Sequence, residues 1–288
     1  EKDGDLTEKN LENGKLLRKG RGMFGKVYYD KTRDSCTKVI GFNNKKNLKY
    51  NKEKISYLLK KTTELSTTEL SSEYIVKFLR IGYLECTYEL NLYIEMENIE
   101  GIELLKFVDN IDIDKKKFIS PLMALKKICD GLYYLQEIYK FIHNDLKSSN
   151  IMISFRDIYD FSIKIIDIDG GHTIDDYIKY NIDEKICGTP LYFSPEKLLN
   201  LSDGFKGEFY RVFKPNKSFK SLTSIEKKEY IKKQDIYSLG VILFEIIYRR
   251  NLHSLIGTFL KFPGNVNQYT LDSDIDNAYN AFLKNYPN

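Results

Sequence analysis

The sequence is poor in the features that disulfide-rich, zinc-binding and membrane proteins depend on. Its four cysteines among 288 residues lie far apart and include no CxxC pair, so neither a disulfide framework nor a zinc site is indicated. The longest apolar runs, such as Val241–Phe244, are far too short to cross a bilayer, and no signal peptide is visible. We therefore expect an intracellular, cytoplasmic protein without a membrane span.

The sequence also lacks an excess of charge of one sign. It holds 45 Lys and Arg residues against 41 Asp and Glu residues, which leaves a net charge of only +4. A nucleic-acid-binding surface needs a denser basic stripe, whereas the lysine clusters at 115–117 and 227–228 are typical of solvated faces. We expect no nucleic-acid partner.

The first hundred residues are typical of a β-rich lobe with one helix. Two β-prone runs around a polar turn predict a hairpin over 25–42, and further strands are predicted within 74–85 and 89–97. Helical spacing of apolar residues predicts a helix over 51–61. We place this lobe at residues 1–98.

From residue 99 to 288 the pattern is mainly helical, so the predicted fold class is α+β with two lobes. Ser120 and Pro121 predict the start of a helix, with the serine as its cap. The stretch 235–248 is apolar almost all round, as is typical of a helix through the middle of a lobe. The helix after Pro121 is expected to bury one stripe of side chains, namely Leu122, Leu125, Ile128, Leu132 and Leu135.

A glycine-rich segment lies near the beginning of the sequence. Gly20, Gly22 and Gly25 have the spacing G-x-G-x-x-G and are followed by Val27. Dinucleotide-binding folds share this pattern, but there the glycines open a helix, whereas here they lead into the β-prone residues 26–29. Glycines between two strands form a flap whose backbone can close over phosphate groups.

A lysine and a glutamate follow the glycine segment. Lys38 lies on the next predicted strand, and Glu53 lies on the predicted helix beyond it. A lysine that is held by a glutamate is suited to bind phosphate oxygens. Either residue alone is typical of a protein surface, but the place of Lys38 directly after a glycine flap favours the phosphate-binding interpretation.

Four segments resemble, in this order, motifs of the eukaryotic protein-kinase family. HNDLKSSN (143–150) is similar to the catalytic loop, and IKIIDID (163–169) is similar to the strand that ends in the magnesium motif. GTPLYFSPE (188–196) resembles the stretch that ends in A-P-E, and DIYSLGVILFE (235–245) resembles the central helix of the large lobe. The resemblance covers nearly the whole chain. It implies a bilobal kinase that uses ATP and Mg²⁺ to phosphorylate hydroxyl groups of protein substrates.

The resemblance assigns roles to the residues of the catalytic loop. Asp145 would accept the proton of the attacking hydroxyl, and Lys147 would neutralise charge on the transferring phosphoryl group. Asn150 and Asp167 would hold the magnesium ions. Lys147 also indicates the serine/threonine branch of the family, in which Thr189 is placed to contact Asp145.

The resemblance assigns a nucleotide site as well. Lys38, braced by Glu53, would cradle the α- and β-phosphates under the flap of Gly20, Gly22 and Gly25. The alternative for the apolar members of this site is plain core packing. The other residues assigned to the nucleotide are Met96, Val27, Cys36 and Met152 around the adenine, the backbone of Glu97 and Ile99 beside it, and Glu103 at the ribose.

Two features near the catalytic loop have alternative interpretations. His143 would be structural, beside Ile168, although a histidine near an aspartate also occurs in hydrolase triads; no nucleophile-elbow serine accompanies it here. Asp169 replaces a glycine of the magnesium motif and could add a ligand or point outward. A register in which Asp169, rather than Asp167, is the metal aspartate is a further alternative.

Asn144 departs from the family pattern at a position of known consequence. It replaces an arginine that in the family receives a phosphate from the activation loop, which predicts weak or no dependence on phosphorylation of that loop. Asp183 and Glu184 lie near the usual phosphosite and could hold the loop by fixed charge. The candidate phosphosites are Thr173, Tyr177 and Tyr180.

The later part of the chain shows two more departures. Residues 198–232 are an insertion that could dock a partner or form plain surface. Glu196 in the family pairs with a late arginine; here that pair is either absent or made with Arg249, Arg250 or a lysine. Two other functions stay open: a partner-binding pseudokinase, and a phosphotransferase that acts on small molecules.

Overall fold

A computed structural model describes most of the chain. It covers residues 16–22, 25–42, 73–85, 90–109, 120–157, 160–179, 188–194 and 219–250, together with Ser56, Lys60 and Lys197. The chain divides into two compact units, Glu1–Glu100 and Gly101–Asn288, whereas the sequence placed the boundary after residue 98. The predicted α+β class is confirmed, because the first unit is built on an antiparallel sheet and the long helices lie in the second.

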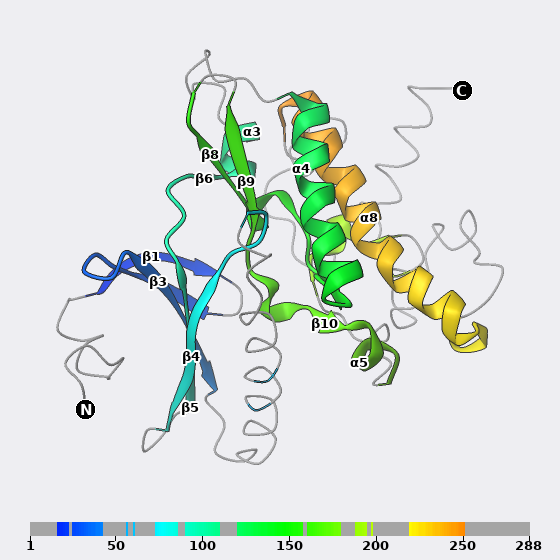
Figure 1. Cartoon of the computed structure of the whole chain (residues 1–288), viewed down its shortest axis with the longest axis horizontal. Coiled ribbons are helices and arrows are strands. Elements are labelled where there is room, and N and C mark those ends of the chain that lie inside the picture. The colour runs from blue at the N-terminus through cyan, green and yellow to red at the C-terminus, as the bar shows by residue number, and fades with distance from the viewer. Residues whose placement is uncertain are drawn as a thin grey trace, which may run out of the picture. The chain divides into compact units, whose positions relative to one another are not determined.

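The first unit contains one antiparallel sheet of five strands in the order β1-β2-β3-β5-β4, drawn in blue to cyan in Figure 1. The predicted hairpin and both later strands are present, while the predicted helix over 51–61 lies outside the described residues apart from Ser56 and Lys60. Asp30 fixes the hairpin turn, because its Oδ1 accepts a hydrogen bond from the backbone N–H of Thr32 (2.9 Å). The strands are β1 (Leu16–Gly22), β2 (Gly25–Asp30), β3 (Ser35–Phe42), β4 (Phe78–Glu85) and β5 (Leu90–Glu97).

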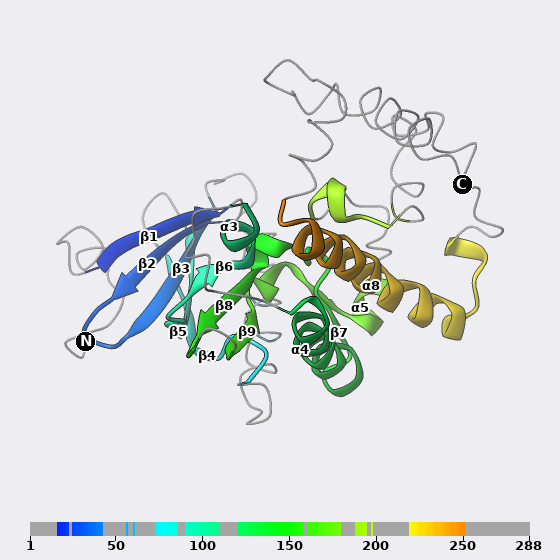
Figure 2. The same ribbon diagram turned by 90° about the horizontal axis from the view of Figure 1, so that it is seen from above.

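The second unit combines long helices with two small ladders. Strands β6, β8 and β9 form one sheet, and β7 pairs with β10. Helix α4 packs against β9 and against α8, and the two helices lie side by side in both Figure 1 and Figure 2. The elements are β6 (Ile102–Glu103), α3 (Leu104–Asp109), α4 (Pro121–Tyr133), β7 (Phe141–Ile142), β8 (Ile151–Phe155), β9 (Phe161–Ile165), β10 (His172–Thr173), α5 (Ile174–Lys179) and α8 (Ser224–Tyr248).

Helix α4 begins at Pro121 with Ser120 as its N-cap residue, as predicted, but the predicted buried stripe is wrong at one position. The Ser120 side chain makes no cap hydrogen bond, while its backbone oxygen accepts from Ala124 N (2.9 Å). Leu122 is 76% exposed. It lies six residues before the buried Ile128, which is about 240° around a helix, so it cannot share the buried stripe. Ala124 takes its place.

Helix α8 is longer and more one-sided than the sequence suggested. It begins at Ser224, where Thr223 and Glu226 form a reciprocal capping box, so the last part of the proposed 198–232 insertion is helix. Residues 198–218 lie outside the described residues, and a docking role for them stays a prediction. The helix is not buried all round, since Ile236 and Tyr237 are 49% and 42% exposed.

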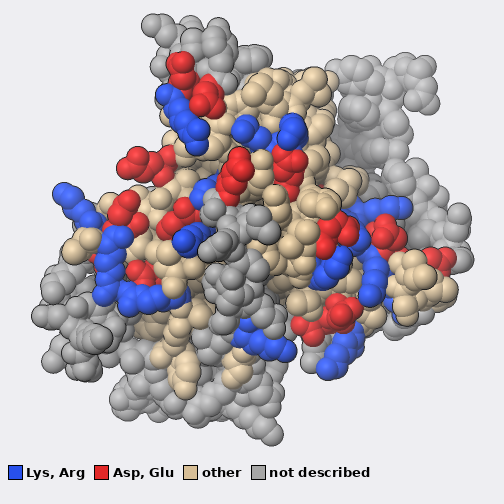
Figure 3. Space-filling model, in the orientation of Figure 1, with Lys and Arg blue, Asp and Glu red and all other residues tan. Residues whose placement is uncertain are grey.

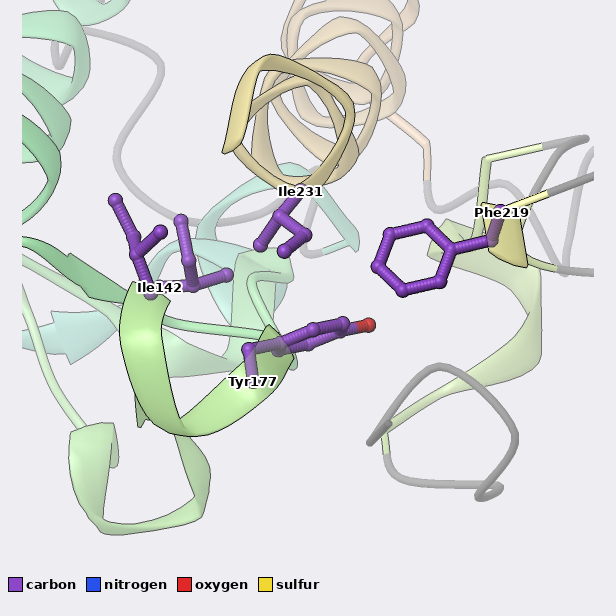
Figure 4. Packing of buried hydrophobic residues seen from close by; sticks show 5 residues of the cluster. Ile142, Tyr177, Phe219 and Ile231 are labelled. Atoms are coloured by element: carbon purple, nitrogen blue, oxygen red, sulfur yellow. The ribbon is translucent and has the colours of Figure 1, made fainter. Parts of the chain in front are cut away.

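A buried hydrophobic cluster joins helix α5 to the start of α8. Figure 4 shows Tyr177 of α5 beneath Ile231 of α8, with Phe219 and Ile142 pointing toward them. Tyr177 has no exposed surface, and its hydroxyl donates to Gln234 Oε1 over 3.4 Å. Tyr177 is therefore inaccessible to a modifying enzyme in this structure. Its burial argues against the prediction that Tyr177 is a phosphosite.

The other two candidate phosphosites differ from each other. Thr173 Oγ1 donates to Asp176 Oδ2 (2.8 Å) and accepts from Asp176 N (3.1 Å), so its hydroxyl caps α5. Tyr180 lies outside the described residues.

We expect Tyr177→Ala to lower the free energy of unfolding by about 3 to 5 kcal/mol, because it empties the centre of this cluster. Tyr177→Phe keeps the ring and removes the long hydrogen bond to Gln234, so it should cost about 1 kcal/mol. Urea unfolding measures both. Tyr133→Ala is the control, since Tyr133 is 58% exposed on α4. A Tyr177→Ala effect as small as that of Tyr133→Ala would contradict the packing shown in Figure 4.

The charged side chains on the face drawn in Figure 3 are mixed in sign among the described residues. Ion pairs among the described residues include Lys126 with Asp130 (2.7 Å) and Lys232 with Glu137 (2.7 Å). In the part of the chain that the structure describes, no helix is both long and apolar enough to span a membrane.

Candidate active site

The loop between β7 and β8 is anchored by a buried carboxylate of α8. Asp235 is 1% exposed, and its two oxygens accept hydrogen bonds from the backbone N–H groups of His143 (2.9 Å) and Asn144 (3.0 Å). Gln136 Nε2, from the turn that follows α4, donates to the same carboxylate at 3.3 Å. Two consecutive amides of the loop are thereby fixed to one helix, directly before Asp145.

His143 is held at both ring nitrogens. Its Nδ1 accepts from the backbone N–H of Asp145 (3.3 Å), so the proton lies on Nε2, which donates to the backbone oxygen of Ile166 (3.0 Å). The ring has no exposed surface, and Ile168 is equally buried. A ring engaged in this way cannot serve as the base of a hydrolase triad, and the contacts fit the structural interpretation.

Three side chains form a closed triangle of hydrogen bonds around Asp145. Thr189 Oγ1 donates to Asp145 Oδ1 (2.7 Å), and Lys147 Nζ donates to Asp145 Oδ2 (2.8 Å). Lys147 Nζ also donates to Thr189 Oγ1 (2.8 Å). The predicted contact between Thr189 and Asp145 is present. The triangle fixes the carboxylate from two sides, although Thr189 lies 44 positions further along the chain.

Asn150 and Asp167 are brought together by the β8–β9 hairpin. Asn150 directly precedes β8 and Asp167 follows β9, and Ile151 pairs with Ile165 in the antiparallel register. The backbone N–H of Ile166 donates to Asn150 O (2.9 Å), which ties the two ends of the hairpin. Asp167 has a left-handed backbone (φ 63°) where the chain turns out of the strand.

The donor set of this pair fits magnesium. Asn150 Nδ2 donates to the backbone oxygen of Asp145 (2.8 Å), which leaves the amide oxygen as the group able to accept a cation. Mg²⁺ prefers oxygen ligands and completes its shell with water and phosphate oxygens. Among the described residues, no group of three or more His, Cys, Asp or Glu side chains could hold a metal alone, so Asn150 and Asp167 would need phosphate or water ligands as partners. The side chain of Asp169 lies outside the described residues, and its role stays open.

In the first unit, the strand register gathers the predicted nucleotide residues on one face of the sheet. Lys38 of β3 lies opposite Val27 of β2 and Ile94 of β5, and Cys36 lies opposite Met96. Residues opposite one another in a sheet share a face, as do residues two positions apart. Lys38 is 4% exposed. Glu53, its predicted partner, lies outside the described residues.

The predicted glycines lie in the β1–β2 hairpin rather than at the start of a helix. Gly22 pairs with Gly25, and Gly20 pairs with Val27. A Cβ on Gly25 would lie 2.3 Å from the backbone oxygen of Val39, so this position needs glycine. The interpretation of these glycines as a link between strands is confirmed.

The remaining predicted nucleotide residues lie at two places. At the end of the first unit, the backbone N–H of Glu97 donates to Lys77 O (3.0 Å), so this N–H is already engaged within the sheet. In the second unit, Glu103 pairs with Met152 across β6 and β8, and Lys106 Nζ donates to Glu103 Oε1 (2.7 Å). The structure therefore brings Glu103 and Met152 together.

A buried hydrogen-bond network below the catalytic loop was not found from the sequence. The hydroxyl of Tyr192 donates to Glu245 of α8 (2.9 Å) and lies 3.1 Å from Ser148 Oγ. Burial, and then the charge of Glu245, raise the pKa of Tyr192, so the phenol stays a donor. Ser238 Oγ donates to the backbone oxygen of Tyr192 (2.8 Å). This network fastens the 188–194 segment, and with it Thr189, to α8.

A signal for the missed residues was present in the sequence. Asp235, Ser238 and Glu245 are polar residues in the largely apolar stretch 235–248, and a buried charged residue in such a stretch needs a partner. Glu196, by contrast, lies outside the described residues, and its predicted arginine pairing stays a prediction. Arg249 stacks on Phe107, with the guanidinium 4.2 Å from the ring centroid.

Comparisons with known proteins agree with this geometry. Residues 14–279 match the protein kinase domain family. Relatives include serine/threonine-protein kinase atg1 of Dictyostelium discoideum (27% identical; 68% of this chain and 23% of the relative), mitogen-activated protein kinase kinase kinase dlk-1 of Caenorhabditis briggsae (28%; 69% and 19%) and dual specificity protein kinase FUZ7 of Mycosarcoma maydis (29%; 73% and 37%). The chain spans less than half of the length of these relatives. It belongs to the protein kinase domain family.

Proposed function

We propose that this chain transfers the γ-phosphoryl group of ATP to serine and threonine hydroxyls of protein substrates. The observation that carries the proposal is the triangle of Asp145, Lys147 and Thr189, in which a buried carboxylate is held by an ammonium and a hydroxyl. The relative atg1 is named a serine/threonine-protein kinase, which supports the proposal, whereas FUZ7 is named a dual specificity protein kinase.

The residues of the site have separate tasks in this reaction. Asp145 accepts the proton of the substrate hydroxyl as its oxygen bonds to the γ-phosphorus and the bond to the leaving ADP breaks. Lys147 holds Asp145 and lowers the cost of charge on the transferring group. Asn150 and Asp167 would hold Mg²⁺, which neutralises the phosphates when it is bound. Lys38 would bind the α- and β-phosphates from the first unit.

The triangle favours an aliphatic hydroxyl as the acceptor. Lys147 and Thr189 occupy both oxygens of Asp145 at 2.7–2.8 Å, so an incoming group must reach a carboxylate that is already crowded. A serine or threonine hydroxyl on a short, slender side chain meets this condition more easily than a hydroxyl on a rigid phenol ring. Dual specificity is the second candidate, because of the FUZ7 relative.

The test is phosphorylation of peptides that differ only at the acceptor. The chain is incubated with γ-labelled ATP, Mg²⁺ and four peptides that carry Ser, Thr, Tyr or Ala, and in parallel with choline and an aminoglycoside. Label on the Ser and Thr peptides, lost in Lys38→Met, is the expected result. Equal label on Tyr would establish dual specificity, and label on the small molecules alone would overturn the proposal. ATP binding without any transfer would indicate a pseudokinase.

The role of Thr189 gives a prediction of its own. Thr189→Val keeps the shape of the side chain but removes the hydroxyl that joins Asp145 to Lys147, so kcat should fall by about 10- to 100-fold through loss of orientation. Thr189→Ser retains the hydroxyl and should stay within about 3-fold of wild type. Steady-state kinetics with the best peptide decide, and equal rates for the Val and Ser variants would show that the hydroxyl is not used.

A further inference from the structure

Lys197 is a buried cation whose head group lies at the catalytic loop. It is only 2% exposed, and its Nζ donates to Asn144 Oδ1 (2.7 Å) and, more weakly, to Asn144 O (3.4 Å). The same Nζ lies 4.0 Å from the centroid of the Phe193 ring. Burying an ammonium is costly unless it is well coordinated, so these contacts are a specific arrangement and not the random position of a surface lysine.

Asn144 is constrained from every side that the structure describes. Its backbone is left-handed (φ 65°), a conformation that asparagine adopts more readily than most residues, and its N–H is held by Asp235 (3.0 Å). Its carbonyl faces Gly188, where an added Cβ would lie 2.6 Å from the oxygen. Lys197 supplies the remaining contact, to the side chain. The next residue along the chain is Asp145.

The positive charge at the catalytic loop comes from a different residue than the family resemblance implies. The resemblance places an arginine at position 144, with its charge directed at a phosphate on the activation loop. Here position 144 carries a neutral acceptor, and the cation comes from position 197, 53 positions later. The contact between Lys197 and Asn144 forms without a phosphate group on the activation loop.

We propose that Lys197 is a positioning residue: by fixing Asn144 it sets the place of Asp145 for phosphoryl transfer, without help from a phosphorylated loop. This inference rests on the proposed function. The contacts that place the Lys197 ammonium are those to Asn144 and to the Phe193 ring, so we expect its effect to pass through the backbone at Asn144. Asn144 alone predicts that activity depends weakly or not at all on phosphorylation of the activation loop. The contact with Lys197 gives that prediction a physical cause, because it holds Asn144 without a phosphate group.

The first test separates positioning from binding. Lys197→Met keeps a long apolar stem but removes the ammonium, and we expect kcat to fall by about 10- to 100-fold while the KM for ATP changes by less than about 2-fold. Lys197→Arg restores a donor and should recover most of kcat. Lys126→Met is the control, since Lys126 is 75% exposed on α4. A Lys197→Met kcat within about 2-fold of that control overturns the proposal.

The second test uses the partner and does not depend on Lys197→Met being stable. Asn144→Gly tolerates the left-handed backbone but lacks the side-chain acceptor, so it removes the shorter of the two hydrogen bonds from Lys197 and keeps the one at 3.4 Å to the backbone oxygen. If the contact acts as proposed, Lys197→Met adds little to Asn144→Gly, and the double variant resembles the worse single variant. Effects on kcat that multiply would show two independent residues and would overturn the proposal.

The third measurement does not require activity. Hydrogen exchange of the amides of residues 141–150 should be faster in Lys197→Met than in wild type, and unchanged in Lys126→Met. A wild-type chain that transfers no phosphate ends the proposed function, yet the exchange rates still decide whether Lys197 holds the loop. Phosphatase treatment of active wild-type protein should leave kcat unchanged, and a collapse of activity would count against the proposal.

Discussion

Replacing Asp145 with asparagine is expected to lower kcat by about three to four orders of magnitude while the protein still folds and binds ATP. An amide at this position keeps an oxygen that can accept from Thr189, but its nitrogen cannot accept from Lys147, so one side of the triangle is retained and one is lost. It cannot take a proton from the substrate hydroxyl, and general-base catalysis of this kind contributes up to about 10⁴-fold. The loss should therefore be in kcat, with the KM for ATP changed by less than about 2-fold.

The measurement pairs single-turnover phosphorylation of the best peptide with ATP binding by calorimetry. Asp160→Asn is the matched control, because Asp160 lies in the exposed turn between β8 and β9 and its side chain is 59% exposed. If Asp145→Asn retains more than about a tenth of wild-type kcat, Asp145 is not the base and the proposed mechanism is wrong. If it loses ATP binding as well, Asp145 acts in binding and not in the chemical step.

The parts of the site that could be predicted from the sequence are those set by local pattern. Alternation along β3 is enough to place Cys36 and Lys38 on one face, and in the structure Val27 of β2 lies opposite Lys38. The assignment of Val27 and Cys36 to the nucleotide came from the family resemblance. The strands 74–85 and 89–97 and the helix start at Pro121 also follow from short-range periodicity and proline geometry.

Long-range polar pairs could not be predicted in the same way. Lys197 with Asn144, and Tyr192 with Glu245, each join residues 53 positions apart, and no periodicity specifies which buried donor meets which acceptor. The contact of Thr189 with Asp145 is comparable in separation, and it was predicted only because the family resemblance supplied it. Tertiary packing decides such pairs.

The start of α8 is a different kind of error, since its signal was in the sequence. Thr223 and Glu226 have the T-x-x-E spacing of a capping box, and the helix does begin between them. The chain between Glu196 and Asp235 is longer than in the family pattern, and this length predicts an insertion over residues 198–232. The family resemblance therefore outweighed a local signal that was correct.

Helix α8 carries the second large prediction, because Asp235 is the group that holds the catalytic loop. Its carboxylate serves three buried donors, from His143, Asn144 and Gln136. Asp235→Ala removes the acceptor for all three. Each buried donor left unsatisfied costs about 1 to 3 kcal/mol, so we expect a loss of unfolding free energy of about 4 kcal/mol or more. Asp235→Asn keeps one oxygen and should cost about 2 to 3 kcal/mol.

These values are measured by urea unfolding, with Glu229→Gln as the control on the same helix, since the Glu229 side chain is 59% exposed. The dependence of the unfolding free energy on urea concentration should stay unchanged, because the variants expose the same surface on unfolding. Only the free energy of unfolding in water should differ. Asp235→Asn should also speed hydrogen exchange at His143 and Asn144, and lower kcat while ATP affinity is retained. If Asp235→Asn proves as mild as Glu229→Gln, the two loop amides do not depend on α8. Asp145 would then have to be held by its other contacts, namely those to Lys147, Thr189 and Asn150.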